Sequence, residues 1–233
     1  MTAHLYWDRM WRTRQGRSGW VAPHPWVVDT VHRLRDRGVR DVLDLGCGIG
    51  RHTFLLAEEG FAVHAIDRSP AAVEFVRGEA ADRRVPLVAD VADITSLPCA
   101  TGAFDLVLAF NVVYHADEDG LARVLGEVRR VLRPGGLYQA TMLSKRNAQY
   151  GRGVEVAANT FVQPRATDDK VHPHLYADAA DLVRLHRGFR LLDAFEAEHG
   201  EAGSYHWHCL FEVERATPWH RSTPRGGTHE QGR

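Results

Sequence analysis

Hydrophobic and polar positions along the chain follow two periods, one typical of buried strands and one typical of amphipathic helices. Short, nearly continuous apolar runs occur at residues 39–45, 61–66, 85–89, 104–110 and 137–143. Runs of this length and composition predict strands that are buried on both faces of a sheet. The pattern therefore indicates a mostly parallel sheet with helices on both sides.

Helical patterns fill the spaces between these runs. The clearest begins at Leu121 and repeats an apolar residue every three or four positions as far as Leu132. Pro25 opens an earlier helix, Ser69 is expected to cap another at its N-terminus, and Asp178 begins the last one. The alternation of strand and helix is the pattern of a doubly wound α/β domain.

Two further strand patterns follow near the C-terminus. Residues 189–198 and 205–214 are separated by a short glycine-containing segment, which predicts an antiparallel pair. The predicted fold is α/β, with a doubly wound, mostly parallel seven-stranded sheet and an antiparallel last strand. In such a sheet the ligand crevice lies at the carboxyl ends of the strands.

Composition narrows the possible partners. The formal net charge of the 233 residues is -1, so no strong field favours nucleic acid or an anionic membrane. No apolar run approaches the roughly 20 residues that a membrane span requires. The cysteines Cys47, Cys99 and Cys209 form no CxxC pair, which argues against a disulfide framework or structural zinc and favours a reducing, cytoplasmic setting.

The strongest functional signal is a glycine-rich turn between a strand and a helix. After Asp44, the glycines Gly46, Gly48 and Gly50 stand at alternate positions. Glycine lets the backbone turn sharply and approach a ligand closely, and the following helix adds free N–H groups. The spacing is GxGxG rather than the GxGxxG of dinucleotide-binding turns, and a purely structural turn is the alternative interpretation.

Three further signals follow in order at predicted strand ends. Asp67, 17 residues beyond Gly50, carries a carboxylate that can accept both hydrogen bonds of a ribose diol. Asp90 and Val91 combine a carboxylate with a backbone N–H and can bind an adenine edge. Asn111 follows the fourth strand. Each is also an ordinary turn residue, but their joint placement favours one shared ligand.

Five segments carry a family resemblance: VLDLGCGIG, AIDRSP, VADV, FDLVLAFNVVYHA and VLRPGGLYQATML. Over about residues 39–143 they resemble the class I S-adenosylmethionine (SAM)-dependent methyltransferases. The chain length and the ending SYHWHCLFE look most similar to the small-molecule and tellurite-resistance-type members. The resemblance implies a Rossmann-like methyltransferase fold with SAM as the cofactor.

The resemblance also implies a role for each matching residue. The glycine turn would line the methionine and ribose of SAM, Asp44 would orient the amino group, and Asp67 would hold the ribose hydroxyls. Asp90 and Val91 would bind the adenine, and the Asn111 carbonyl would face the sulfonium. The cofactor-binding residues expected on this basis are Asp44, Gly46, Cys47, Gly48, Gly50, Asp67, Asp90, Val91 and Asn111.

The expected reaction is in-line transfer of a methyl group to an oxygen, nitrogen, sulfur or metalloid atom of a small molecule. The chain lacks the [DNS]-PP-[YFW] motif after the fourth strand, which argues against methylation of nucleobase amines. Two alternatives are an NAD-dependent oxidoreductase on a similar sheet, disfavoured by the glycine spacing, and a non-enzymatic SAM-binding regulator. We expect a monomer or homodimer whose partner is the acceptor alone, without nucleic acid or membrane.

Catalytic groups are expected near the end of the fourth strand. The protein mainly has to align the reacting atoms, and a base is needed only when the acceptor must lose a proton. His115 is the candidate base, with a helix-start residue as the alternative. Tyr114 is expected to shape the pocket or to make a cation–π contact with the sulfonium, and a core aromatic is the alternative.

Acceptor contacts are expected from outside the motifs that carry the resemblance. Residues 1–24 are predicted to be a lid that carries Tyr6 and Trp11, although packing on the sheet edge is equally compatible. Within the domain formed by residues 25–215, an insertion at about residues 144–173 is expected to bind the acceptor. Residues 216–233 are predicted to be a disordered tail.

Histidines form two His-x-His pairs. His172 and His174 are expected to help enclose the acceptor. His206 and His208 share one face of a strand, while Cys209 points the other way. Four imidazoles could bind a transition metal, but neither pair has the spacing of a known site, so we predict no metal. Acceptor contact and simple packing remain the alternatives.

Overall fold

The computed structural model describes residues 2–214, so the predicted tail at 216–233 lies outside the described residues. The seven predicted strands are present in it. They are β1 (Asp41–Leu45), β2 (Ala62–Asp67), β3 (Val88–Val91), β4 (Phe104–Ala109), β5 (Leu132–Ser144), β9 (Phe189–Glu198) and β10 (Tyr205–Val213).

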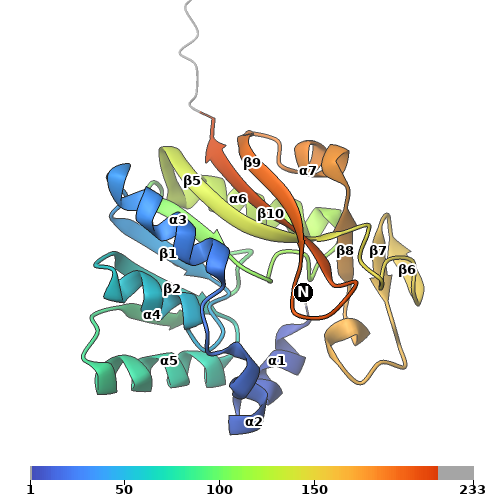
Figure 1. Cartoon of the computed structure of the whole chain (residues 1–233), viewed down its shortest axis with the longest axis horizontal. Coiled ribbons are helices and arrows are strands. Elements are labelled where there is room, and N and C mark those ends of the chain that lie inside the picture. The colour runs from blue at the N-terminus through green and yellow to red at the C-terminus, as the bar shows by residue number, and fades with distance from the viewer. Residues whose placement is uncertain (1, 215–233) are drawn as a thin grey trace, which may run out of the picture.

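The strand order confirms the predicted α/β topology. The first five strands pair in parallel in the order β3-β2-β1-β4-β5. β10 then pairs antiparallel with β5, from His206 opposite Leu143 to Glu212 opposite Leu137, and β9 pairs antiparallel with β10. Figure 1 shows the twisted sheet running through the molecule with helices on either side.

The helices on each face follow from the alternation of side chains along the strands. Val42 belongs to an apolar cluster with α3 (Pro25–Asp36) and α4 (Arg51–Glu58). Leu43, its neighbour, belongs to the cluster that contains α6 (Glu118–Val131) and α7 (Ala179–Leu185). Successive residues of a strand point to opposite faces, so both faces of β1 are covered.

Helix α5 (Pro70–Arg83) packs beside β3 and begins as predicted. The Ser69 side chain accepts a hydrogen bond from the Ala72 backbone N–H, and Pro70 occupies the first turn. Further along, Asp178 and Asp181 form a capping box at the start of α7. These local signals set where each helix starts and therefore where each preceding strand ends.

Three strands lie beyond the seven predicted ones. The segment expected to be an acceptor insertion forms β6 (Val154–Ala157) and β7 (Thr160–Val162), and β8 (His174–Ala177) follows it. β8 continues the sheet by pairing in parallel with the last two residues of β5, Ser144 and Leu143. The β6–β7 hairpin escaped prediction because its strands have only four and three residues, and the apolar Val154 and Val156 are exposed.

The N-terminal segment is helical and is attached to the domain. It forms α1 (His4–Trp11), α2 (Arg14–Arg17) and the 3₁₀ helix η1 (Ser18–Trp20). In α1, Asp8 accepts hydrogen bonds from the Ser69 hydroxyl at 2.7 Å and the Ala71 N–H at 3.2 Å. Helix α1 is therefore held at the N-terminus of α5, close to the strand carboxyl ends (Figure 1).

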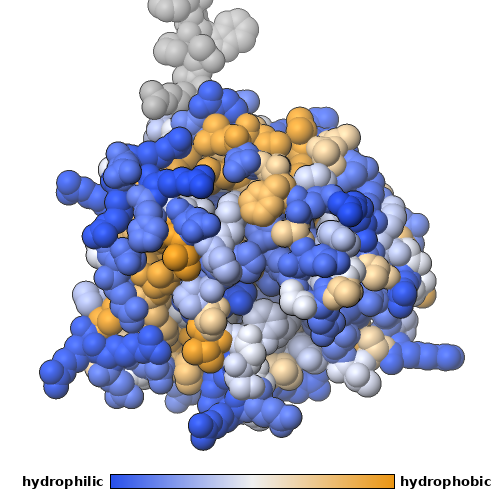
Figure 2. All heavy atoms as spheres, viewed as in Figure 1, coloured by the Kyte–Doolittle hydropathy of each residue, from blue (hydrophilic) through white to orange (hydrophobic). Residues whose placement is uncertain are grey.

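The outer surface is mostly hydrophilic on the face shown in Figure 2, with smaller hydrophobic areas at the top of the view and on the left, over the region of α3 and α4. Within residues 2–214, none of the helices combines the length and apolarity that a membrane crossing requires.

Candidate functional site

A cavity of about 470 Å³ lies at the carboxyl ends of the central strands, between the glycine turn, the N-terminal helices and the segment before β8. Its volume is in the range of small-molecule sites. Most of the residues predicted from the sequence line it. These are Tyr6, Trp11, Asp44, Gly46, Cys47, Gly48, Asp67, Asn111, Tyr114, His115 and His174.

The glycine turn needs glycine for two physical reasons. Gly46 and Gly48 have φ angles of 72° and 53°, a region that side chains disfavour. A Cβ on Gly46 would lie 2.4 Å from a methyl carbon of Val112, and one on Gly48 would lie 3.3 Å from the Trp11 ring. Gly50 sits behind the cavity as the N-cap of α4, so its role is to form the turn.

Asp44 is buried directly beneath this turn. Its carboxylate accepts a hydrogen bond of 2.6 Å from the Thr53 hydroxyl. Burial raises the pKa of Asp44 to about 6, although the Thr53 hydrogen bond and the Arg51 charge oppose this shift. A bound ammonium group would favour the ionised carboxylate, so the site suits a ligand that carries a positive charge there.

Asp67 ends β2 as predicted and is tied to the glycine turn. One carboxylate oxygen accepts the Gly48 N–H at 2.9 Å, and the other accepts the Ser69 N–H at 2.8 Å. Burial raises the pKa of Asp67, and these backbone hydrogen bonds oppose the shift. Each carboxylate oxygen has a second lone pair, so Asp67 can still accept ligand hydroxyls from the cavity.

The structure does not bring Asp90 and Val91 into the cavity. The Asp90 side chain is 43% exposed and forms an ion pair with Arg77 at 3.0 Å, while Val91 is exposed. Asp93 and Ile94 line the cavity in their place. The sequence contains the triplet Val-Ala-Asp twice, at 88–90 and 91–93. Its second copy stands just past the strand, where the chain turns towards the cavity. This repeat was the signal in the sequence that offered Asp93 as an alternative to Asp90.

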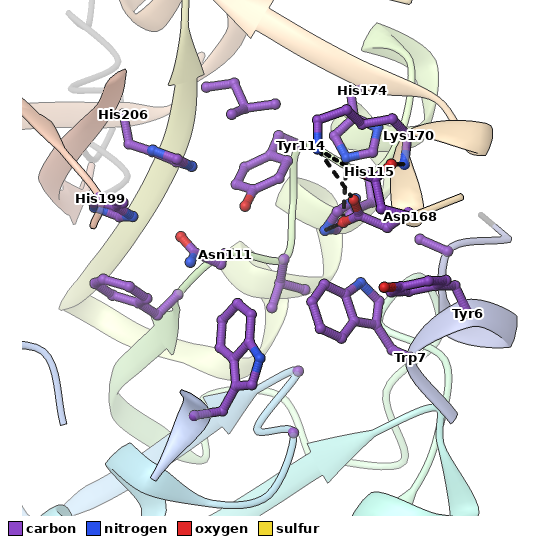
Figure 3. Close-up of a pocket in the computed structure, with 18 of the residues that line it drawn as sticks. Tyr6, Trp7, Asn111, Tyr114, His115, Asp168, Lys170, His174, His199 and His206 are labelled. Carbon is purple, nitrogen blue, oxygen red and sulfur yellow. Dashed lines mark hydrogen bonds and ion pairs between the residues drawn. The ribbon is translucent and has the colours of Figure 1, made fainter. Parts of the chain in front are cut away.

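Asn111 begins the turn after β4 in a left-handed conformation, with φ 61°. Its N–H donates to the Thr141 hydroxyl at 2.8 Å, and that hydroxyl donates to the Asn111 side-chain oxygen at 3.0 Å. The turn directs Tyr114 and His115 into the cavity, where Figure 3 shows the Tyr114 hydroxyl pointing inward. Tyr114 and His115 are both buried.

Aromatic rings from the N-terminal segment form one wall. Trp7 and Trp11 stack with centroids 5.1 Å apart, and Trp20 meets Trp7 edge-on at 5.1 Å. The Arg51 guanidinium lies 5.2 Å from the Trp20 ring centroid and 5.1 Å from that of Phe110. Sequence reasoning missed Arg51, which places a cation beside the glycine turn where a ligand carboxylate could bind.

On the opposite side, two imidazoles surround one carboxylate. The His174 Nε2 atom lies 3.5 Å, and the His115 Nε2 atom 3.9 Å, from the same Oδ2 atom of Asp169 (Figure 3). Asp169 comes from the 3₁₀ helix η2 (Asp169–Val171), inside the predicted acceptor insertion, and was not anticipated from the sequence.

The charges of this group follow from its burial. Burial, followed by the neighbouring His174, lowers the pKa of His115 to about 3, so its imidazole is neutral at physiological pH. Burial alone would raise the pKa of Asp169, but hydrogen bonding to His174 and nearby positive groups lower it to about 2. A base with a pKa of about 3 removes protons poorly near neutral pH, which argues against His115 alone as the general base.

His172 lies outside the cavity, contrary to the expectation that it encloses an acceptor. Its Nδ1 is 2.9 Å from the Thr2 hydroxyl, and its backbone carbonyl lies 2.9 Å from the Nδ1 of His174. Residues two apart on an extended segment share a face only in a regular strand, and β8 starts at His174. His172 therefore positions His174 through its backbone.

A second group of histidines lies at the β9–β10 end of the cavity. His199 and His206 line the cavity with their rings stacked at 3.9 Å. His208 and Cys209 are both fully buried although they point to opposite faces, because β10 lies between β5 and β9 under cover on both sides. The ring nitrogens of His24, His199 and His208 lie within 4.8 Å of one another.

Comparison with known proteins gives a consistent result. Residues 42–136 match a family model described as a methyltransferase domain. A probable S-adenosylmethionine-dependent methyltransferase of Mycolicibacterium smegmatis is 30% identical over 214 residues, covering 86% of this chain and 74% of that protein. Several other curated relatives are matched over only 38% to 63% of their own length.

Solved structures agree on the fold. A 1,6-didemethyltoxoflavin-N1-methyltransferase of Burkholderia thailandensis, solved with 1,6-didemethyltoxoflavin and S-adenosylhomocysteine, superposes with a TM-score of 0.68. The superposition covers 91% of this chain and 88% of that one, at 20% sequence identity. Because the sequence identity is low, this likeness shows a shared fold and nothing further.

Proposed function

The chain belongs to the S-adenosylmethionine-dependent methyltransferase family, and from this premise we propose that it methylates an oxygen, nitrogen, sulfur or metalloid atom of a small molecule. The observation that supports the proposal is the shared cavity. Cofactor-motif residues line one side of it, and a separate group of polar side chains lines the other.

The residues of the chain fit SAM. Gly46 and Gly48 leave a cradle that a Cβ would fill, and Asp67 retains lone pairs for the ribose hydroxyls. Asp44 would hold the amino group, and Arg51 would hold the carboxylate of the methionine part. We assign the adenine contact to Asp93 and Ile94 in place of Asp90 and Val91. When bound, SAM supplies a methyl group on a sulfonium, which becomes a neutral thioether as an acceptor lone pair takes the methyl.

The rest of the site positions the acceptor and excludes water. Trp7 and Trp11 line the cavity on the N-terminal side, which suits the lid role proposed for residues 1–24. Tyr114, His115 and His174 lie where an acceptor would meet the methyl group if SAM occupies the glycine turn. Orienting reactants in a water-poor cavity is the main contribution such an enzyme makes.

A small acceptor is favoured by the size of the site. Cofactor and acceptor must share about 470 Å³. The net charge of -1 gives no field that would attract nucleic acid. The Burkholderia protein, similar in fold, is a 1,6-didemethyltoxoflavin-N1-methyltransferase whose structure holds 1,6-didemethyltoxoflavin beside S-adenosylhomocysteine. The segment at 144–173, which carries Asp169, is the proposed acceptor insertion.

Calorimetric titration with S-adenosylhomocysteine, SAM and NADH tests the cofactor first. We expect heat with the first two and none with NADH, and the Asp67→Asn variant should bind S-adenosylhomocysteine more weakly. Mass spectrometry should then detect S-adenosylhomocysteine produced with members of a panel of hydroxyl, amine, thiol and metalloid acceptors. Absence of SAM binding by folded protein would overturn the proposal. SAM binding without methyl transfer to any acceptor of the panel would favour the alternative of a non-enzymatic SAM-binding regulator.

A further inference from the structure

Three potential metal-ligating side chains converge at the acceptor end of the cavity. His115 follows β4, Asp169 lies in η2, and His174 opens β8, so three distant segments contribute one side chain each. Their ligand atoms lie within 4.8 Å of one another, with the two imidazole nitrogens 3.5 and 3.9 Å from one carboxylate oxygen. Ligands about 2.0–2.2 Å from one ion lie roughly 3–3.5 Å apart, so the gap between these atoms is close to ion-sized.

The hydrogen bonding of His174 leaves the correct nitrogen free. Its Nδ1 lies 2.9 Å from the backbone carbonyl of His172. A carbonyl only accepts, so Nδ1 carries the proton. In the neutral imidazole Nε2 then carries the lone pair, whereas a protonated ring would instead donate from Nε2 to Asp169, 3.5 Å away. This lone pair is directed to the side of Asp169. A histidine ligand whose second nitrogen donates to a backbone carbonyl is the usual arrangement in metal sites.

His115 lacks the hydrogen bonds that a buried imidazole needs. It is 5% exposed, and its Nδ1 is buried with no partner of normal hydrogen-bond geometry among the described residues, although the Asn111 backbone interacts with the ring. Its Nε2 is 3.9 Å from Asp169, beyond hydrogen-bonding distance. Buried polar side chains are nearly always paired, so an imidazole in this state needs an explanation. A cation between Nε2 and Oδ2 would supply the missing interaction.

The charge of the group also suits a cation. Asp169 supplies a carboxylate, and each imidazole can direct one ring nitrogen towards its Oδ2 atom. The nearest positive side chain is Lys170, whose ammonium pairs with Asp168 at 2.8 Å and lies 3.9 Å from the other oxygen of Asp169. It therefore approaches from the Oδ1 side and leaves Oδ2 to the imidazoles.

In the second histidine group the nitrogens that face one another are already engaged, although the Nδ1 of His208 is, like that of His115, buried without a partner among the described residues. The Nδ1 of His24 accepts the Trp26 N–H at 3.2 Å, so its Nε2 must carry a proton and cannot also bind a metal as a neutral ligand. His199 and His208 are joined through their Nε2 atoms at 2.7 Å. This group serves as the natural comparison for the first.

We propose that His115, Asp169 and His174 bind a divalent first-row transition metal ion, which in turn binds the oxygen or sulfur of the methyl acceptor. Two imidazoles and one carboxylate, with open positions facing a cavity, are the donor set of catalytic rather than structural sites. The proposal rests on the proposed methyltransferase function and deepens it. A hydroxyl or thiol bound to such an ion becomes more acidic and loses its proton to water, which leaves an anionic nucleophile. The acceptor class is therefore a small hydroxyl or thiol compound.

Zinc titration of chelator-treated protein tests this directly, with Co²⁺ absorption spectra as a second readout of the ligand geometry. The His174→Ala and Asp169→Asn variants should each bind Zn²⁺ at least about 100-fold more weakly than the wild-type protein. Two matched controls remove an imidazole without removing a ligand. His172→Ala keeps the backbone carbonyl, and His199→Ala alters the second histidine group, so both should retain the wild-type affinity.

The outcomes separate the metal from the methyl donor. Wild-type protein that binds no Zn²⁺, or ligand variants that both keep the wild-type affinity, would refute the metal site. Loss of binding in His199→Ala alone would place the ion at the second group and also overturn the proposal. S-adenosylhomocysteine binding is measured on the same samples and should be unchanged in Asp169→Asn. If the wild-type protein binds Zn²⁺ but not S-adenosylhomocysteine, the proposed function fails while the metal site stands.

Discussion

The sharpest structural test of the glycine turn is the substitution Gly46→Ala. The added methyl carbon would lie 2.4 and 2.7 Å from the two Cγ atoms of Val112 and 3.1 Å from its Cβ. Val112 is β-branched and therefore has few alternative rotamers. Residue 46 also has φ 72°, so alanine there would occupy a left-handed conformation. The substitution thus combines a steric overlap with backbone strain.

The two costs can be estimated separately. A non-glycine residue held in the left-handed region costs about 1–2 kcal/mol. Forcing an extra methyl group into a packed site costs about 1–3 kcal/mol. Gly46→Ala should therefore lower the free energy of unfolding by about 2–5 kcal/mol. In the double variant Gly46→Ala/Val112→Ala the overlap is relieved, so only the backbone cost and the small loss from truncating Val112 should remain.

Urea unfolding followed by tryptophan fluorescence measures these differences, and calorimetry with S-adenosylhomocysteine reports the turn's shape. In the double-mutant cycle, the double variant should be about 1–3 kcal/mol more stable than the sum of the two single losses would predict. A single variant that loses less than about 1 kcal/mol and binds S-adenosylhomocysteine normally would refute the geometry. Strict additivity would refute the contact with Val112.

Three further predictions concern the carboxylates near the cofactor side. The pKa of Asp44 is about 6 when folded against an ordinary value of 3.8, so the unfolded chain loses this proton first and stability falls as pH rises from about 4 to 6. Asp44→Asn should abolish this fall and raise the free energy of unfolding at pH 7 by up to about 3 kcal/mol. Urea unfolding at about pH 4 and at pH 7 measures both effects, and a variant whose free energy of unfolding still falls between these pH values would contradict the prediction. Asp67→Asn should weaken S-adenosylhomocysteine binding about 10- to 100-fold in calorimetry, and tighter binding would count against the assigned ribose contact. Asp8→Ala removes the hydrogen bonds from Ser69 and Ala71, so limited proteolysis should cut the N-terminal segment sooner while global stability changes by only about 1–2 kcal/mol; equal cleavage rates would show that α1 is held by its tryptophans alone.

Much of the cofactor side could be predicted because it depends on short-range signals. Gly46 and Gly48 are required by backbone geometry, and Asp67 stands where a strand ends, so spacing alone located them. The prediction that Asp90 lies at the ligand site was wrong in placing it in the cavity. Asp90 stands at a strand end, as predicted, but only the direction of the following turn distinguishes it from Asp93, which does line the cavity. That direction depends on tertiary packing, as does the ion pair that holds Asp90 outside the cavity.

The acceptor side could be predicted only in outline. His115 and His174 were identified as candidates, but Asp169 lies in a polar segment with no periodic pattern to mark it. The three meet because β8 returns to the end of β5, a long-range pairing that leaves no local trace. The β6–β7 hairpin was missed for a similar reason, since its strands are too short for alternation to be recognised.

The junction between β5 and β8 has a consequence for engineering. Leu143 pairs with Tyr176 and Ser144 with Ala177, so backbone hydrogen bonds hold both ends of the intervening stretch beside each other. A replacement stretch would thus start and finish at anchored points, while the strands that carry the glycine turn and Asp67 stay untouched. Residues 145–173 therefore form a natural unit for exchange between homologues. If this segment binds the acceptor as proposed, such an exchange should alter the choice of acceptor independently of the methyl donor.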